Sequence, residues 1–287
     1  MPFFSRPSKS CPTVHFSRLV VHGDSFSDNG NVYELSNHSW PRDAVANELG
    51  ARLENYAYGS ATTDSEIVQG KTGINADLPV PGFIQQIQLF RNNQKTSSDN
   101  NLSATLFMIS FQGNDFWFDP TIDTQVVLGS IERGVRQLVD LGARHIMVLE
   151  NSDIGKIPAF GDNSTLAKER SELSAKQHRE YQEMKKRLEV EYGAPRRGGR
   201  TFVNCGTGSS MTDKVNIAFF DLFEFLEGFR SPDNLERLNI TNVTHGCVSP
   251  DYQTRCEDAG GYFFYDSFHP SAKVHRAIGE AVLEFVL

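Results

Sequence analysis

Short apolar runs alternate with longer segments of helical periodicity along most of this chain. Each apolar run is followed by turn-forming or polar residues, which is typical of buried strands. The predicted strands are Arg18–His22, Leu53–Ala57, Thr105–Phe111, His145–Glu150 and Val215–Phe220. Strands that alternate with helices in this way predict a parallel sheet that is covered on both faces.

Between the predicted strands, apolar residues recur at the spacing of amphipathic helices. Three such faces are Phe83, Ile84, Ile87 and Phe90; then Val127, Ile131, Val135, Leu138 and Val139; and last Val274, Ala277, Ile278, Ala281, Val282 and Phe285. The highly charged segment from Thr165 to Tyr192 is expected to form a surface helix. Its narrow apolar stripe contains Leu173, Tyr181, Met184 and Leu188.

The composition fits one globular domain. The chain has 287 residues, 39% of them hydrophobic and 22% charged, which suffices to bury a core without metals or disulfides. No internal repeat or sharp change of composition interrupts it. We therefore expect residues 1–287 to form a single three-layer α/β/α sandwich with a mostly parallel sheet of about five strands. Residues 1–16 are expected to form an irregular N-terminal arm.

The charge balance argues against several classes of partner. A net charge of −8 disfavours a phosphate-binding surface, and the basic run at residues 196–200 is interrupted by Gly198 and Gly199. No apolar run approaches the roughly 20 residues needed to span a bilayer. We expect neither a nucleic-acid partner nor a membrane span, and the oligomeric state stays open.

Two features of the sequence point to different compartments. The N-terminal segment MPFFSRPSKSCPTVHF lacks the apolar core of a signal peptide, which favours a cytoplasmic location. Asn-x-Ser/Thr acceptor sites favour secretion and begin at Asn37, Asn101, Asn163, Asn239 and Asn242. Both locations stay open.

The four cysteines fit neither a zinc site with paired Cys-x2-Cys spacing nor a dense disulfide framework. Cys247 and Cys256 lie nine positions apart in a segment rich in Gly, Pro and Asp. A disulfide there would stiffen the loop ahead of DSFHPS, whereas a reducing compartment would leave two thiols. The sequence leaves both possibilities open.

The stretch VVHGDSFSDNGN places Ser25 directly after the first predicted strand. Functional groups gather at the carboxyl ends of parallel strands. A serine hydroxyl is a poor nucleophile unless a histidine accepts its proton and a carboxylate orients that histidine. Asp266 and His269 in YDSFHPS form the only Asp-x-x-His pair of the sequence. We predict Ser25 as nucleophile, His269 as base and Asp266 as the orienting acid.

Two further strand ends supply hydrogen-bond donors for a negatively charged reaction intermediate. Gly59 in YAYGSATTD offers a backbone N–H that no side chain shields, and Asn114 in FQGNDFW offers a side-chain amide. The N–H of Ser25 itself would be the third donor. Donors of this kind form the oxyanion hole that acyl transfer requires.

Asp24, Phe116 and Trp117 are candidate substrate contacts. Asp24 could instead cap the turn, which is the commoner role of an acid at such a place. Consecutive aromatic residues cannot all face one way, so we expect some in the core and some at the pocket. His22 is expected to be buried, hydrogen-bonded and neutral rather than a second base.

No sequence signature of a bound cofactor occurs. The chain lacks His-Glu-x-x-His, a phosphate-binding loop and a dinucleotide fingerprint, and GDSFS lacks the last glycine of the Gly-x-Ser-x-Gly elbow. We therefore expect no metal and no organic cofactor.

Taken together, the motifs resemble the blocks of the GDSL esterase/lipase family, also called SGNH hydrolases. FSRLVVHGDSFSDNGN resembles the first block, NYAYGSATTD the second, SFQGNDF the third and YDSFHPSAKVH the last. The resemblance implies a flavodoxin-like fold and the same roles for Ser25, Gly59, Asn114, Asp266 and His269. VQGKTGINADLPVPGFIQQIQLF and NITNVTHGC further resemble fungal members, including some grouped with carbohydrate acetylesterases.

One segment departs from the family pattern. Many plant and fungal relatives carry a GRFSNG-like segment after the first block, whereas NVYELSNHSWPRDAVANELG stands here, so this side of the pocket is expected to be shortened. We predict a serine hydrolase for small carboxylic esters with short acyl or acetyl groups. A lipase, phospholipase or acyltransferase for longer acyl chains is the alternative, and a non-catalytic binding protein with an occluded site is another.

Overall fold

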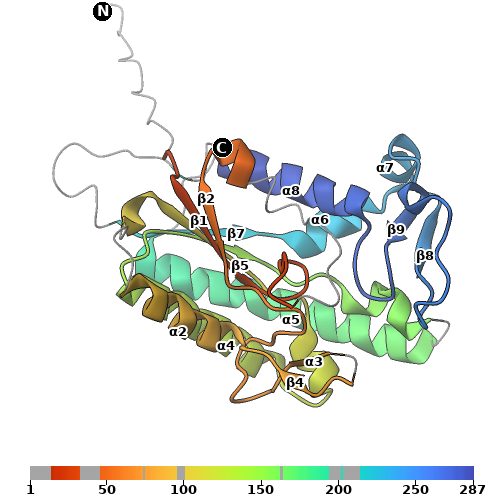
Figure 1. Cartoon of the computed structure of the whole chain (residues 1–287), viewed down its shortest axis with the longest axis horizontal. Coiled ribbons are helices and arrows are strands. Elements are labelled where there is room, and N and C mark those ends of the chain that lie inside the picture. Colours follow the sequence, from red (N-terminus) through yellow and green to blue (C-terminus); the bar gives the residue numbers. More distant parts are fainter. Residues whose placement is uncertain are drawn as a thin grey trace, which may run out of the picture.

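A five-stranded parallel sheet forms the centre of the protein (Figure 1). The computed structural model describes residues 14–32, 46–73, 75–95, 101–161, 164–193, 202 and 214–287. The strands are β1 (Arg18–Gly23), β2 (Arg52–Asn55), β5 (Thr105–Ser110), β6 (His145–Leu149) and β7 (Asn216–Phe220). Their order, β2-β1-β5-β6-β7, is the flavodoxin-like doubly wound order. All five predicted strands are confirmed.

In four of the five strands, alternate residues face two separate cores, whereas β2 at the edge of the sheet is partly exposed. In β1, Leu19 and Val21 pack into one apolar cluster and Val20 into the other, and all three are completely buried. The same alternation holds in β5, β6 and β7. Because both faces are buried, these strands have continuous apolar sequences, which is why they were predicted so directly.

Helices cover both faces of the sheet (Figure 1). One layer contains α2 (Phe83–Gln94), α4 (Thr124–Asp140) and α5 (Ser164–Tyr192). The opposite layer contains α6 (Leu222–Phe229) and α8 (Ala272–Val286). The predicted three-layer sandwich is confirmed.

Helix α5 differs in one respect from the expected surface helix. Its stripe residues Tyr181, Met184 and Leu188 are almost completely buried in the core of its layer. The Tyr181 hydroxyl donates a hydrogen bond to the carbonyl of Val148 in β6. The narrow stripe therefore packs directly against the sheet, and the charged residues occupy the outer side of the helix.

Smaller elements connect this framework. The helical ones are η1 (Leu102–Ala104), α3 (Asn114–Phe118), η2 (Ile154–Lys156), η3 (Pro158–Phe160), α7 (Pro232–Arg237) and η5 (Ala259–Gly261). β3 (Lys71–Thr72) pairs with β4 (Leu78–Pro79) in antiparallel fashion, and β8 (Asn242–Gly246) pairs with β9 (Tyr262–Phe264) in parallel fashion. The β8-β9 pair leads into the segment that carries Asp266 and His269.

Several predictions fall on segments outside the described residues. These are residues 1–13 of the expected arm, residues 33–45 of the shortened segment, and the basic run at 196–200. Val14 and Phe16 are irregular in backbone but buried in the core, and the Val14 amide donates to the Phe202 carbonyl.

Within the described ranges, no helix is both long enough and apolar enough to cross a bilayer.

Candidate active site

Ser25 lies in a tight turn directly after β1. The buried carboxylate of Asp24 holds this turn, since it accepts hydrogen bonds from the amides of Phe26 at 3.0 Å and of Gln112 after β5. A Cβ on Gly23 would lie 2.7 Å from the carbonyl of Ser110, so the chain approaches β5 too closely here for any other residue. Asp24 therefore fixes the position of Ser25 through both of its oxygens.

Helix α2 also holds the end of β1. The side chain of Gln86 is completely buried and forms two hydrogen bonds with the backbone of Gly23, accepting from its N–H and donating to its carbonyl. Sequence reasoning missed Gln86 and Gln112. For Gln86, the sequence does contain one indication of a buried polar role. Its amide lies on the apolar face of the helix, at helical spacing between Phe83 and Phe90.

Ser25, His269 and Asp266 form one continuous chain of hydrogen bonds. His269 Nε2 lies 2.8 Å from the hydroxyl oxygen of Ser25, and His269 Nδ1 lies 2.8 and 3.0 Å from the two carboxylate oxygens of Asp266. The structure thus brings together three residues that are separated by up to 244 positions in the sequence.

Asp266 is buried, but its surroundings favour the ionised form. Burial alone would raise its pKa, yet the hydrogen bond from the His269 ring and the amides of Phe268 and His269 outweigh burial and lower it. A carboxylate with these donors stays charged and can orient an imidazole beside it.

A disulfide joins Cys247 and Cys256 in the segment before this acid. The Cys247 amide donates to the carbonyl of Phe264 at the end of β9. The Tyr265 amide in turn donates to the carbonyl of His269 at 2.8 Å. The disulfide loop is thereby connected to the turn that presents Asp266 and His269, as one of the two interpretations of the sequence proposed.

The candidate oxyanion donors differ in their availability. Asn114 begins α3, lines the same cavity as Ser25, and donates one side-chain hydrogen to the Ala61 carbonyl at 2.9 Å, which leaves its second amide hydrogen. The Gly59 amide also lies at the cavity, but it donates to the buried carboxylate of Asp28 at 2.8 Å. This geometry differs from the expectation of an unengaged Gly59 N–H.

The neighbouring Ser60 has the unusual backbone of this turn. Its φ is 68°, in the left-handed region, and it lines the cavity with Gly59. Among the described residues its amide donates no hydrogen bond. Asp28 meanwhile accepts from the amides of Asn31 and Val32 as well as Gly59, so the Asp28 carboxylate determines which amide of the second strand end is engaged.

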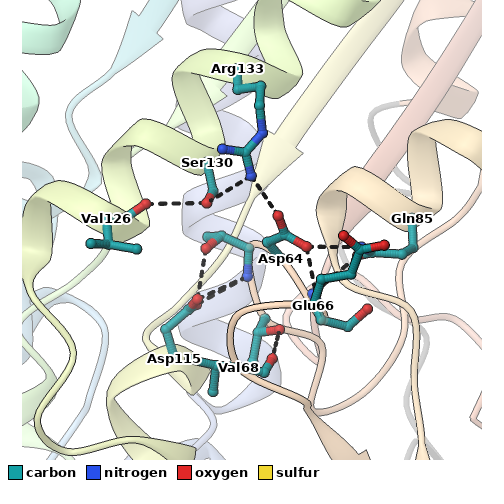
Figure 2. Close-up of polar contacts among 11 residues, drawn as sticks. Asp64, Glu66, Val68, Gln85, Asp115, Val126, Ser130 and Arg133 are labelled. Carbon is teal, nitrogen blue, oxygen red and sulfur yellow. Dashed lines mark hydrogen bonds and ion pairs between the residues drawn. The ribbon is translucent and has the colours of Figure 1, made fainter.

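Hydrogen bonds and one partly exposed ion pair hold the segment that follows the second strand (Figure 2). Asp115 accepts hydrogen bonds from the amide and hydroxyl of Thr63, and burial raises its pKa to about 6 although these bonds oppose the rise. Asp64 pairs with Arg133 of α4 and accepts from Gln85 of α2 at 2.8 Å. These contacts hold the segment after Gly59 against α3, and no local motif marks them.

A cavity of about 630 Å³ opens beside Ser25 and His269. Part of its wall is aromatic, since Trp117 is 50% exposed and packs edge-on against Phe268 with ring centroids 4.9 Å apart. Phe116 is 2% exposed and packs beneath with Val127. Both side chains border the cavity, but Phe116 is buried whereas Trp117 exposes half of its surface there.

The chain is similar to known proteins along most of its length. The profile of the GDSL-like Lipase/Acylhydrolase family matches residues 19–282. The thermolabile hemolysin of Vibrio parahaemolyticus is 23% identical, with 93% of this chain and 63% of the hemolysin covered. An acetylesterase of Thermothelomyces thermophilus is 23% identical, with 98% of this chain and 91% of that protein covered.

The chain is also similar to a solved structure. A lipolytic protein of the G-D-S-L family from Veillonella parvula gives a TM-score of 0.49 at 12% identity, covering 93% of this chain and 96% of that protein. This chain spans less than two thirds of the length of the hemolysin, at 63%.

The five-stranded parallel sheet and its strand order define an α/β protein of the doubly wound class. The chain belongs to the GDSL-like lipase/acylhydrolase family, because the family profile covers most of its length. The family resemblance drawn from the sequence motifs is therefore confirmed.

Proposed function

We propose that the protein hydrolyses carboxylic esters through an acyl-enzyme formed on Ser25. The observation that carries the proposal is the unbroken hydrogen-bond chain from the Ser25 hydroxyl through His269 to Asp266. Serine nucleophiles need this arrangement of base and orienting acid, whatever the fold that supplies it.

The proposed reaction has two steps. His269 Nε2 accepts the proton of Ser25 while the serine oxygen attacks the acyl carbon, and His269 then donates that proton to the departing alcohol. Water, deprotonated by the same imidazole, attacks the acyl-enzyme and releases the acid. Asp266 keeps the Nδ1 hydrogen of His269 directed towards itself and stabilises the imidazolium.

We further propose which groups hold the oxyanion. Asn114 has a free side-chain hydrogen at the cavity, and the Ser25 amide lies at the turn itself. The third donor predicted from the sequence, the Gly59 amide, would have to release Asp28 first. We therefore propose that the Ser60 amide takes this role, because its left-handed backbone places a second amide at the same wall of the cavity.

For the substrate we propose an ester of a short acyl group, acetyl among them, with a larger alcohol. A cavity of about 630 Å³ is far larger than an acetyl group requires, and Trp117 offers an exposed ring for the alcohol part. Similarity to an acetylesterase over 98% of this chain agrees with this choice.

The apolar side of the cavity favours a second candidate. Phe160, Phe268 and Ile157 line it together with Trp117, and such a wall also suits a longer acyl chain, as in a lipase or an acyltransferase. A series of p-nitrophenyl esters from acetyl to palmitoyl separates the two. Short-acyl specificity predicts the highest kcat/KM for acetyl or butanoyl esters, and a maximum at long chains would favour the second candidate.

The test of the nucleophile uses two neighbouring serines. Ser25→Ala should lower kcat for p-nitrophenyl acetate by a factor of about 10⁴ or more. Ser27→Ala is the matched control, because Ser27 lies in the same turn but is completely buried. Turnover by Ser25→Ala equal to that of the parent protein would contradict the mechanism.

A further inference from the structure

A second group of titratable side chains lies at the carboxyl edge of the sheet, away from Ser25. Glu150 directly follows β6, Asp221 directly follows β7, and His178 projects from α5. One ligand atom from each of these residues lies within 4.8 Å of the others. None of the three lines the cavity that contains Ser25.

Glu150 is the buried member of this group. Its side chain is 2% exposed, and one carboxylate oxygen lies 2.8 Å from Nδ1 of His178. The other oxygen, Oε2, is buried and has no hydrogen-bond partner among the described residues. A buried carboxylate oxygen without a donor is costly, so something that carries positive charge is expected beside it.

The neighbours of Glu150 sharpen this expectation. A carboxylate oxygen of Asp221 lies within 4.8 Å of the ligand atoms of Glu150 and His178, and Oε1 of Glu224 lies 4.0 Å from Nε2 of the same imidazole. Two carboxyl groups that approach so closely must share either a proton or a cation. His178 supplies a nitrogen ligand at the same place. A cation would use this ligand, whereas a proton shared between the two acids would not, so the presence of His178 favours the cation.

We propose that Glu150, His178 and Asp221 bind a divalent transition-metal ion of the Zn²⁺ type. Zinc ligands lie about 2.0–2.2 Å from the metal, so tetrahedral ligand atoms are about 3.5 Å apart, within the spacing of this group. One imidazole with two carboxylates suits Zn²⁺ or Mn²⁺, whereas Ca²⁺ and Mg²⁺ favour all-oxygen sites. Water would complete the coordination.

The role assigned to this metal is structural. It would join the ends of β6 and β7 to α5, three elements that meet at this edge. The Glu150 carbonyl also accepts a hydrogen bond from the side chain of Gln112 at 3.0 Å, and the Gln112 amide donates to Asp24 in the serine turn. The ion would therefore stabilise the same edge that carries the serine turn, without contacting a substrate.

Asp221→Asn is the most informative variant. Asp221 caps α6 by accepting a hydrogen bond from the Glu224 amide at 2.9 Å, and asparagine caps a helix about as well as aspartate. The substitution thus removes a metal ligand charge and keeps the cap. Asp123→Asn is the matched control, because Asp123 caps α4 in the same way through the Gln125 amide.

The experiment measures metal uptake and thermal stability of the whole chain. Protein stripped with a chelator is dialysed against ZnCl₂ and analysed for bound zinc, and its melting temperature is recorded with Zn²⁺, Mn²⁺, Ca²⁺ or Mg²⁺. We expect one equivalent of zinc in the parent protein and in Asp123→Asn. We also expect a rise of about 5 °C in melting temperature when free Zn²⁺ exceeds Kd 100-fold.

Asp221→Asn and His178→Gln should each bind zinc about tenfold more weakly or worse. Ca²⁺ and Mg²⁺ should leave the melting temperature unchanged. No stoichiometric uptake by the parent protein would overturn the proposal, and so would equal uptake by both variants. Neither metal uptake nor melting temperature involves ester hydrolysis. The metal proposal can therefore be wrong while the proposed hydrolysis is right, and the hydrolysis can be wrong while the metal proposal is right.

Discussion

Two pairs of a carboxyl group and an imidazole lie at the same edge of the sheet. The distance between acid and imidazole is the same in both pairs, but the pKa of the acid is shifted in opposite directions. Asp266 lies 2.8 Å from His269, and Glu150 lies 2.8 Å from His178. The pKa of Asp266 is lowered, whereas that of Glu150 is raised to about 10. The distance between acid and imidazole therefore does not decide the charge of the acid.

The difference comes from the other contacts of each carboxylate. Asp266 accepts hydrogen bonds from two backbone amides as well as from the imidazole. Glu150 has one oxygen without a partner among the described residues and lies near Asp221 and Glu224. A preorganised set of donors thus makes an ionised acid that can support an imidazolium, whereas burial beside other acids disfavours the ionised form of Glu150.

The largest expected effect comes from removing the charge of Asp266. Asp266→Asn should lower kcat for p-nitrophenyl acetate by about 10³–10⁴-fold, because the Nδ1 hydrogen of His269 then loses its acceptor and the wrong tautomer is favoured. Asp123→Asn serves as the control for an acid-to-amide change. Activity of Asp266→Asn within tenfold of the parent protein would contradict the role of Asp266.

The next effect concerns the oxyanion donors. Asn114→Ala should lower kcat about 10²–10³-fold with a smaller change in KM, because the donor acts mainly on the transition state. Steady-state kinetics on p-nitrophenyl acetate measure both constants. An equal rise of KM at constant kcat would instead assign Asn114 to ground-state binding.

The disulfide tests how far the Asp266 turn depends on its support. Replacing Cys247 and Cys256 together by serine should lower the free energy of unfolding by about 2–3 kcal/mol, since the closed loop is short. Urea denaturation measures this change. A variant as stable as the parent protein would show that the surrounding backbone contacts hold this loop by themselves.

A third imidazole shows what burial does without any acid. His22 packs among Tyr56, Phe83 and Phe90, and burial lowers its pKa to about 3 from an ordinary 6.5. Between these values the unfolded chain binds a proton that the folded protein does not, so stability falls as pH falls. The contribution of His22 is up to about 1.4 kcal/mol per pH unit.

Urea denaturation at several pH values between 7 and 5 tests this slope. His22→Gln should reduce the slope of the free energy of unfolding against pH by the equivalent of about one proton. This change of slope is expected whatever the substitution does to stability at neutral pH. His145 acts in the same direction, with its pKa lowered to about 4 by burial, and remains in both proteins. Parallel slopes for the two proteins would contradict the assignment to His22.

Much of this fold could be predicted because hydrophobic periodicity carries it. Buried parallel strands are apolar throughout, and the Ser25 and Asp266 to His269 segments stand directly at strand ends or in a short loop. The expectation for His22 was right about burial and wrong about hydrogen bonding, since neither ring nitrogen has a partner in the described part of the chain.

Other features depend on backbone torsion and on long-range contacts. The engaged Gly59 amide results from Asp28, which is 31 positions away, and from the φ of 68° at Ser60. The group of Glu150, His178 and Asp221 has no local spacing that a metal motif would have. Neither a hydrophobic pattern nor a short motif records such contacts, so the structure was needed to find them.

The most direct test of the central claim is the identity of the residue that reacts covalently. The protein is labelled with a fluorophosphonate, digested and analysed by peptide mass spectrometry, with Ser25→Ala and Ser27→Ala in parallel. We expect one phosphonylated residue, Ser25, in the parent protein and in Ser27→Ala, and no label in Ser25→Ala. Label on another residue, or none on a folded parent protein, would contradict it.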